Sequence, residues 1–226
     1  MKTLKALLIV LVSTALYNCG QMNNRKVAAA DTDSVVEVEY NDEVTINECV
    51  SDKKIPNGLT LGEVVEYIGK NKEEVNMLNQ FKSYHKALLR GDIDNAIHYQ
   101  YQDAAKYFRK YYPGNSDDNV MRKIFEDLSM KTIEEVKRFE SHGVELNIVV
   151  SRVIRKVSQG DNIFYVFEIV SNMTNEKLQL HTTPDLTLGV STNRGRNWTF
   201  NAMNEDTPNI LRISFPYKIV DMVMGY

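Results

Sequence analysis

The spacing of hydrophobic residues predicts three helical regions in the first half of the folded part of the chain. Apolar and aromatic side chains recur every three or four residues over 72–90, from residue 93 to about 111, and over 117–142. This spacing gathers them on one face of an amphipathic helix. A Gly-Asp pair at 91–92 separates the first two regions, and a Pro-Gly pair at 113–114 ends the second.

Two capping signals predict where helices begin. Thr60 and Glu63 have the spacing of a capping box, in which each side chain bonds the backbone amide of the other residue, and Thr132 and Glu135 repeat this spacing. The first pair predicts a helix from residue 60 that is interrupted near Gly69. The second pair predicts a bend or restart inside the third helical region.

After Gly143 the hydrophobic period changes to that of β-strands. Residues 144–150 alternate between apolar and polar, and from Val153 the alternation continues in the opposite phase, as a β-bulge produces. Residues 163–170 are apolar on both faces, which is typical of a central strand. We expect further strands at 178–180, 186–190 and 198–200, a short helix starting at Thr207-Pro208, and a terminal strand over 217–224.

Helices followed by strands predict an α+β fold. The segment Tyr84–Ile97, in which Gly91-Asp92 joins two helices, resembles the opening of the nuclear transport factor 2-like superfamily. The resemblance covers about residues 71–226. It implies N-terminal helices packed in a strongly bent, cone-like antiparallel sheet. An unrelated α+β fold is the alternative.

The N-terminus is similar to a secretory signal peptide. Two lysines precede a short apolar run over 6–12, and small and polar residues follow; such a run is too short to span a bilayer. Cys19-Gly20 resembles a bacterial lipobox, with Leu16 three residues upstream. The resemblance implies cleavage before Cys19 and attachment of a lipid such as palmitate to it. Cleavage after Ala15, which would release a soluble protein, is the alternative.

We therefore expect a signal peptide at 1–18, a lipid-attached flexible tether at 19–57 and a single α+β domain at 58–226. The tether is polar and acidic, although residues 36–40 alternate as a strand at a sheet edge would. The N-terminal lipid would hold the exported protein on a bacterial membrane, facing the periplasm or the outside.

Composition excludes several classes of function. The chain has 27 basic and 30 acidic residues. It therefore lacks the excess of basic residues that is typical of nucleic-acid-binding proteins. Its two cysteines, Cys19 and Cys49, are too few for a disulfide framework. The four histidines include no pair at metal-binding spacing, and the chain has no glycine-rich phosphate loop. We expect neither a metal nor a cofactor.

Residues 191–200 resemble an Asp-box, a structural hairpin of sialidase-like propellers, with Asn193 at the aspartate position. A single copy does not make a propeller. We expect a hairpin in which Asn193 bonds the turn backbone, Gly195 takes a positive φ and Trp198 folds back on the strand.

The candidate pocket is the concave side of the sheet, facing the inward side chains of Phe81, His85, Tyr101 and Phe108. Inward tyrosines give a pocket apolar walls with hydroxyl groups. The alternative is that His85 is a hydrogen-bonded core residue and that the aromatic side chains only pack the core. Asp103 is predicted to point away from Tyr101, so we identify no catalytic residue.

The leading hypothesis is a non-enzymatic, lipid-anchored protein of the bacterial cell envelope. Its cone-like pocket would bind a small apolar or amphipathic ligand or an envelope protein. One alternative is an enzyme that uses the pocket for acid–base chemistry of the isomerase or dehydratase type. The other is a protein-interaction subunit whose core is filled by side chains.

Overall fold

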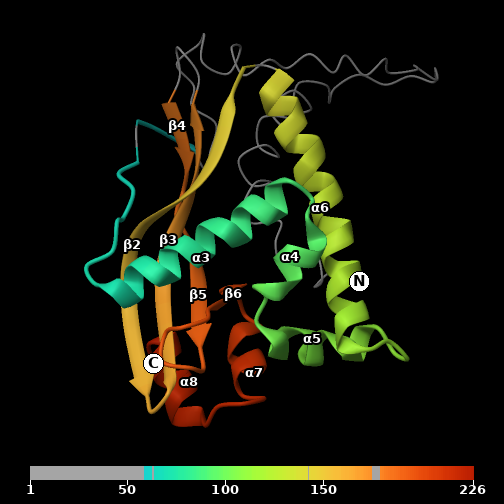
Figure 1. Ribbon diagram of the computed structural model, residues 1–226, viewed down its shortest axis with the longest axis vertical. Helices are drawn as coiled ribbons and strands as arrows, with labels where there is room; N and C mark the ends of the chain where they lie inside the picture. Colours follow the sequence, from blue (N-terminus) through green and yellow to red (C-terminus); the bar gives the residue numbers. More distant parts are fainter. Residues whose placement is uncertain (1–58, 63, 142, 175–178) are drawn as a thin grey trace, which may run out of the picture.

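The computed structural model describes residues 59–62, 64–141, 143–174 and 179–226 (Figure 1). The predicted signal peptide, the lipid-attachment residue Cys19 and the predicted tether lie outside the described residues. Within them, most helices come first in the chain and an antiparallel sheet follows. The predicted α+β class is therefore confirmed.

The described chain begins in the sheet, so the helix predicted from residue 60 is wrong. Leu59–Leu61 forms strand β1, which pairs with β4 (Gln179–Thr182). Residues 64–70 then run beside another strand of the sheet, where the Tyr67 amide donates to the Val150 carbonyl at 2.8 Å. Backbone pairing thus replaces the predicted first helical turn.

Helix α3 (Lys72–Leu89) has clear sequence signals at both ends. The Asn71 side chain caps its N-terminus by accepting a hydrogen bond from the Glu74 amide at 2.9 Å. Beyond its C-terminus, Gly91 has a φ of 68°, a conformation that favours glycine. Asp92 then caps the next helix, so the chain turns sharply between the two.

The helix predicted from residue 93 to 111 is divided by pairing with the sheet. It consists of α4 (Ile93–His98), α5 (Gln102–Phe108) and the 3-10 turn η4 (Arg109–Tyr111). Between α4 and α5, the Phe200 amide donates to the Tyr99 carbonyl at 2.7 Å. The Tyr101 amide donates to the Phe200 carbonyl at 3.2 Å. These bonds to a strand take the place of helical bonds, so the helix stops there.

Helix α6 (Asp117–Ser141) is the longest helix of the described chain and has no break. The bend or restart predicted near residue 132 is therefore wrong. Ser116 precedes the helix and its hydroxyl accepts the Asn119 amide at 3.3 Å. Helix α6 stands to one side of the sheet, with α4 and α5 packed against it (Figure 1).

Strand β3 (Asn162–Thr174) is the central strand of the sheet. Strand β2 (Glu145–Gln159) pairs along one edge of it. On the other edge, β4 pairs with the C-terminal end of β3 and β5 (Asp185–Ser191) pairs with its N-terminal part. Strand β6 (Thr199–Ala202) adds to β5, and all of these pairs are antiparallel.

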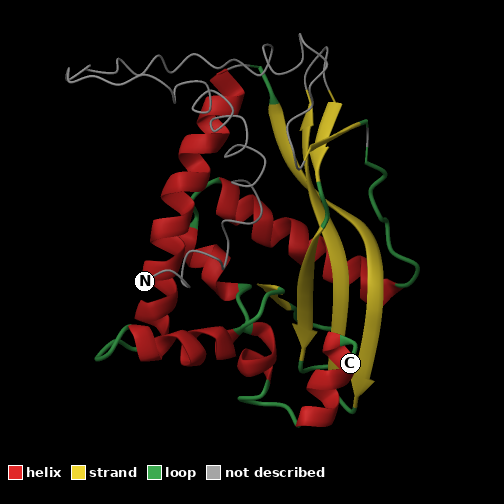
Figure 2. Cartoon of the chain, turned by 180° about the vertical axis from the view of Figure 1, so that it is seen from behind, coloured by secondary structure: helices red, strands yellow, loops and turns green. Residues whose placement is uncertain are grey.

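The predicted β-bulge is confirmed. The register of β2 against β3 shifts between Val150 and Arg152, and again between Val153 and Arg155. Bulges bend the strand that carries them, and Figure 2 shows β2 and β3 curving along their length.

Both faces of β3 are covered by other elements, which explains why its sequence is apolar on both sides. On one face, the Phe167 ring lies 4.9 Å from the ring of Phe81 in α3. On the other face, the Phe164 ring lies 4.8 Å from the ring of Phe215. Helix α3 therefore covers one side of this part of the sheet, and the C-terminal segment that contains Phe215 covers the other.

The C-terminal segment is helical, so the terminal strand predicted over 217–224 is wrong. It forms α7 (Thr207–Leu211) and α8 (Tyr217–Met224). The buried residues of α8 are Ile219, Val220 and Val223. Their spacing fits a helix face better than the period of two of a strand.

Candidate functional site

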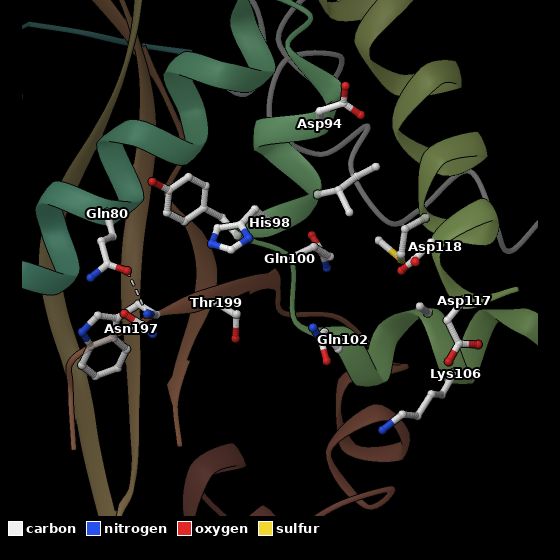
Figure 3. Close-up of a pocket in the computed structure, with 15 residues that line it drawn as sticks. Gln80, Asp94, His98, Gln100, Gln102, Lys106, Asp117, Asp118, Asn197 and Thr199 are labelled. Carbon is white, nitrogen blue, oxygen red and sulfur yellow. Dashed lines mark hydrogen bonds between the residues drawn. The ribbon is translucent and has the colours of Figure 1, made fainter. Parts of the chain in front are cut away.

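A cavity of about 780 Å³ lies between α3, α6 and the start of β6 (Figure 3). Its volume falls in the range of small-molecule sites. Its apolar lining residues are Ile97, Tyr99, Ala105, Met121 and Trp198. Its polar lining residues are Gln80, Asp94, His98, Gln100, Gln102, Lys106, Asp117, Asp118, Asn197 and Thr199.

One wall of the cavity is the end of the Asp-box-like hairpin, residues 191–200. The Asn193 Oδ1 accepts the Asn197 amide at 2.9 Å. The Trp198 indole N–H donates to the Gly195 carbonyl at 3.0 Å, and Gly195 has a φ of 77°. Asn193, Gly195 and Trp198 thus have the hairpin roles expected from the sequence. The turn also places Asn197 on the cavity, a position that the Asp-box-like pattern does not indicate.

Two side chains of α3 hold this wall in place. The Gln80 Oε1 accepts the Trp198 backbone amide at 2.9 Å, and its Nε2 donates to the Arg196 carbonyl at 2.9 Å (Figure 3). The Asn76 Nδ2 donates to the Gly195 carbonyl at 2.7 Å. Leaving such backbone groups unpaired would cost free energy, so α3 fixes the position of the hairpin.

Residues 98–102, from the end of α4 to the start of α5, supply several lining residues of the cavity. Gln100 is 5% exposed, and its Nε2 donates to the Asn201 Oδ1 at 3.0 Å. Its Oε1 accepts the Tyr84 hydroxyl at 3.2 Å. Gln102 is exposed, and its side chain bonds to no residue that the structure describes. Gln100 therefore supports this segment, whereas Gln102 is available to a ligand.

The wall formed by α4 and α6 carries acidic side chains. Asp117 and Asp118 lie in the first turn of α6, where carboxylates stabilise a helix. Arg109 Nη1 lies 3.1 Å from the Asp117 Oδ1, an ion pair without hydrogen-bond geometry. Asp94 pairs with Arg122. The Asp118 carboxylate has no partner in the described part of the chain.

The four predicted pocket residues lie in the core and are not among the lining residues of this cavity. Phe81, His85, Tyr101 and Phe108 are each at most 6% exposed. The His85 ring lies 4.4 Å from the Phe81 ring, and its Nδ1 has no hydrogen-bond partner among the described residues. Burial lowers the pKa of His85 to about 3, so the imidazole is neutral at pH 7.

A buried tyrosine–aspartate pair lies near the cavity. The Tyr101 hydroxyl donates to the Asp103 Oδ2 at 2.6 Å, and Lys106 Nζ donates to the Oδ1 at 2.6 Å. The prediction that Asp103 points away from Tyr101 is wrong, because Tyr101 is the extended N-cap residue of α5. Burial acts to raise the pKa of Asp103. Hydrogen bonds from Lys106, Ser214 and Tyr101 outweigh burial and leave this pKa below its usual value.

The sequence around the lining residues predicts local structure but does not show that these residues lie together. Asn197 and Thr199 belong to the Asp-box-like string, which indicates a hairpin but no cavity. Gln100 and Gln102 flank Tyr101, which lies on the hydrophobic stripe of the predicted helix. Neither signal indicates that the two segments meet.

No protein-family model matches the chain, and neither the curated proteins nor the solved structures contain a match. In the described residues, no group of three or more His, Cys, Asp or Glu side chains is arranged to hold a metal ion. No helix in that part of the chain is both long and apolar enough to cross a membrane. A functional assignment therefore depends on the cavity itself.

Proposed function

We propose that this protein is a lipid-anchored component of the bacterial cell envelope whose α+β domain binds a small polar ligand. The cavity of about 780 Å³ supports the proposal, because its size suits a small molecule. Three of its lining side chains, Gln102, Asn197 and Asp118, form no hydrogen bond or ion pair within the described residues. A ligand can form hydrogen bonds with these three side chains without displacing contacts within the protein.

The polar lining changes the expected character of the ligand. The sequence favoured an apolar or amphipathic molecule, because it placed aromatic side chains in the pocket. Phe81 and Phe108 instead pack in the core, and amides and carboxylates line the cavity. A hydrocarbon there would leave these polar groups without partners, which costs free energy.

Binding is favoured over acid–base catalysis by the position of the perturbed titratable groups. Burial lowers the pKa of His85 and raises that of Tyr101, and hydrogen bonds lower that of Asp103. All three are core residues outside the lining of the cavity, and Asp185, whose pKa burial raises to about 6, also lies outside that lining. A general acid or base must reach the proton that it transfers.

We also propose membership of the nuclear transport factor 2-like superfamily. The turn from α3 to α4 supports it, since Gly91 has a positive φ and Asp92 caps α4, as a helix–Gly-Asp–helix opening requires. The antiparallel strands that follow the helices, with the bulges and curvature of β2, are consistent with a bent sheet.

The binding function is tested by blocking the cavity. Asn197 is exposed on the cavity wall, so Asn197→Trp should fill the space without disturbing the core. Asn79→Trp is the matched control, because Asn79 is exposed on α3 and does not line the cavity. Protein purified from the organism that makes it is denatured, and the released small molecules are identified by mass spectrometry.

We expect a polar molecule to accompany the wild type and the control but not Asn197→Trp. The binding function would be wrong if the same molecules accompanied all three proteins, or if none accompanied the wild type.

The lipid anchor is tested separately by intact-mass measurement of the wild type and Cys19→Ala. We expect an acyl mass on the wild type alone. A wild type without that mass would refute the anchor and leave the binding function standing.

A further inference from the structure

The charges around the cavity disfavour an anionic ligand. Its lining holds three carboxylates, those of Asp94, Asp117 and Asp118, against one amine, that of Lys106. Placing a further negative charge beside them costs free energy, because like charges repel most strongly where water is partly excluded.

A cationic ligand is not favoured either, because most of these charges are already paired. Asp94 pairs with Arg122, and Arg109 lies 3.1 Å from Asp117. Lys106 is 2.6 Å from the buried Asp103. A cationic ligand would have to compete with Arg122 for Asp94 and with Arg109 for Asp117. The pattern of pairs therefore suits an uncharged ligand.

The free amides indicate which uncharged groups the cavity can recognise. Gln102 and Asn197 lie on different sides of the cavity (Figure 3). Each side-chain amide has two N–H donors and one oxygen acceptor. A hydroxyl group both donates and accepts, so a molecule with hydroxyls around its periphery can bond both amides at once. The Asp118 carboxylate adds acceptors for the same kind of group.

Two rings add apolar surface next to these polar groups. The His98 and Tyr99 rings are 5.8 Å apart and inclined at 80°, and both residues line the cavity. Aromatic rings offer an apolar face beside a polar edge. A saccharide ring has the matching combination, since its C–H groups form apolar faces and its hydroxyls lie around the rim.

We infer that the ligand of this cavity is an uncharged saccharide, held by the amides of Gln102 and Asn197. The inference rests on the proposed function, because it names the class of ligand for the same cavity. Both amides can bond hydroxyl groups of the ligand, and no described residue bonds either of them.

The test is a titration followed by ¹H–¹⁵N NMR on the full chain carrying Cys19→Ala. The side-chain amide signals of Gln102 and Asn197 are assigned by their loss in Gln102→Ala and Asn197→Ala. The neutral probes are cellobiose and N,N′-diacetylchitobiose. Glucuronic acid is the anionic probe, glucosamine the cationic one and trialanine the peptide.

We expect a neutral disaccharide to shift both amide signals and to bind more tightly than the other probes. Losing two hydrogen bonds of ordinary strength weakens binding about thirtyfold, so the Gln102→Ala, Asn197→Ala double variant should show that loss. The matched control Asn79→Ala, outside the cavity, should bind as the wild type does.

The outcomes separate the inference from the proposed function. If only trialanine or a charged probe shifts the signals, the saccharide inference is wrong and a ligand site remains. If no probe shifts them, the saccharide inference is wrong, and the molecules released from the purified wild type decide the proposed function.

Discussion

Replacing His85 by leucine should remove an acid sensitivity that this one side chain gives to the fold. His85 is 5% exposed, its ring contacts those of Phe81 and Tyr84, and its Nδ1 has no hydrogen-bond partner in the described chain. Burial lowers its pKa from 6.5 to about 3. Between these two values, the folded protein keeps the imidazole neutral while the unfolded chain protonates it.

The sign and size of the effect follow from this difference. The contribution of the neutral imidazole is fully present above pH 6.5 and is lost as the pH falls toward 3. Each pH unit below the pKa of 6.5 of the unfolded chain lowers the free energy of unfolding by about 1.4 kcal/mol. Lowering the pH to 4.5 should therefore remove about 2.7 kcal/mol of the free energy of unfolding. His85→Leu cannot bind this proton. Between pH 7.5 and pH 4.5, the His85→Leu variant should therefore lose about 2.7 kcal/mol less stability than the wild type does.

The assay is urea denaturation of both proteins at pH 7.5 and pH 4.5, in the Cys19→Ala background. Trp198 is the only tryptophan of the sequence and is 1% exposed, so its fluorescence reports unfolding of the domain. His98→Leu is the matched control, because it also replaces a histidine by leucine but at an exposed position. If His85→Leu lost as much stability on acidification as the wild type, the buried neutral imidazole would be refuted.

Three further substitutions test the contacts around the cavity, each by urea denaturation at pH 7.5. Gly195→Ala should destabilise the protein by about 1–2 kcal/mol, because Gly195 has a positive φ; the new Cβ would also lie 2.8 Å from the Glu73 side chain. An unchanged stability would contradict the tight turn. Gln80→Leu leaves the Trp198 amide without its side-chain acceptor, whereas the Arg196 carbonyl keeps its bond from Asn76 Nδ2 at 3.1 Å. For the one unpaired amide we expect a loss of about 1–3 kcal/mol; a loss no larger than that of Asn79→Leu, at an exposed position of α3, would show that the bond to the Trp198 amide is dispensable. Asp103→Asn should cost about 1–1.5 kcal/mol, because the bond from the Tyr101 hydroxyl then has a neutral acceptor in place of a charged one; an unchanged stability would mean that the charge of Asp103 contributes little.

The sequence was a good guide where structure depends on neighbouring residues. The hydrophobic spacing of α3 identifies its buried face, and Gly91 marks its end. The change of phase after Val150 gives the bulge in β2. The doubly apolar sequence of β3 gives its central position. Each of these features is encoded within about one element of the chain.

The errors occurred where a distant strand competes with local preference. Thr60 lies in a strand because its segment pairs with β4 instead of starting a helix. The helix predicted through Tyr101 is broken because Phe200 supplies other hydrogen-bond partners. No pattern within either segment shows that these partners are present.

The cavity was misplaced for a related reason. Periodicity shows that Phe81 and His85 point inward, but not whether they meet other side chains or an empty space. The Phe167 and Phe200 rings of the sheet pack directly against Phe81, so that region is filled. The cavity lies instead where segments from four helices and strand β6 come together, and most of the side chains that line it there are polar.

The bonds between α3 and the hairpin connect residues 116 to 120 positions apart. Contacts at such sequence separation are slow to form, because a long loop must close before they are gained. An incomplete chain that ends before residue 190 would contain α3 but lack one side of the cavity. Under the proposed export, ligand capture would have to wait until translocation is finished, so binding competence would serve as a measure of complete folding.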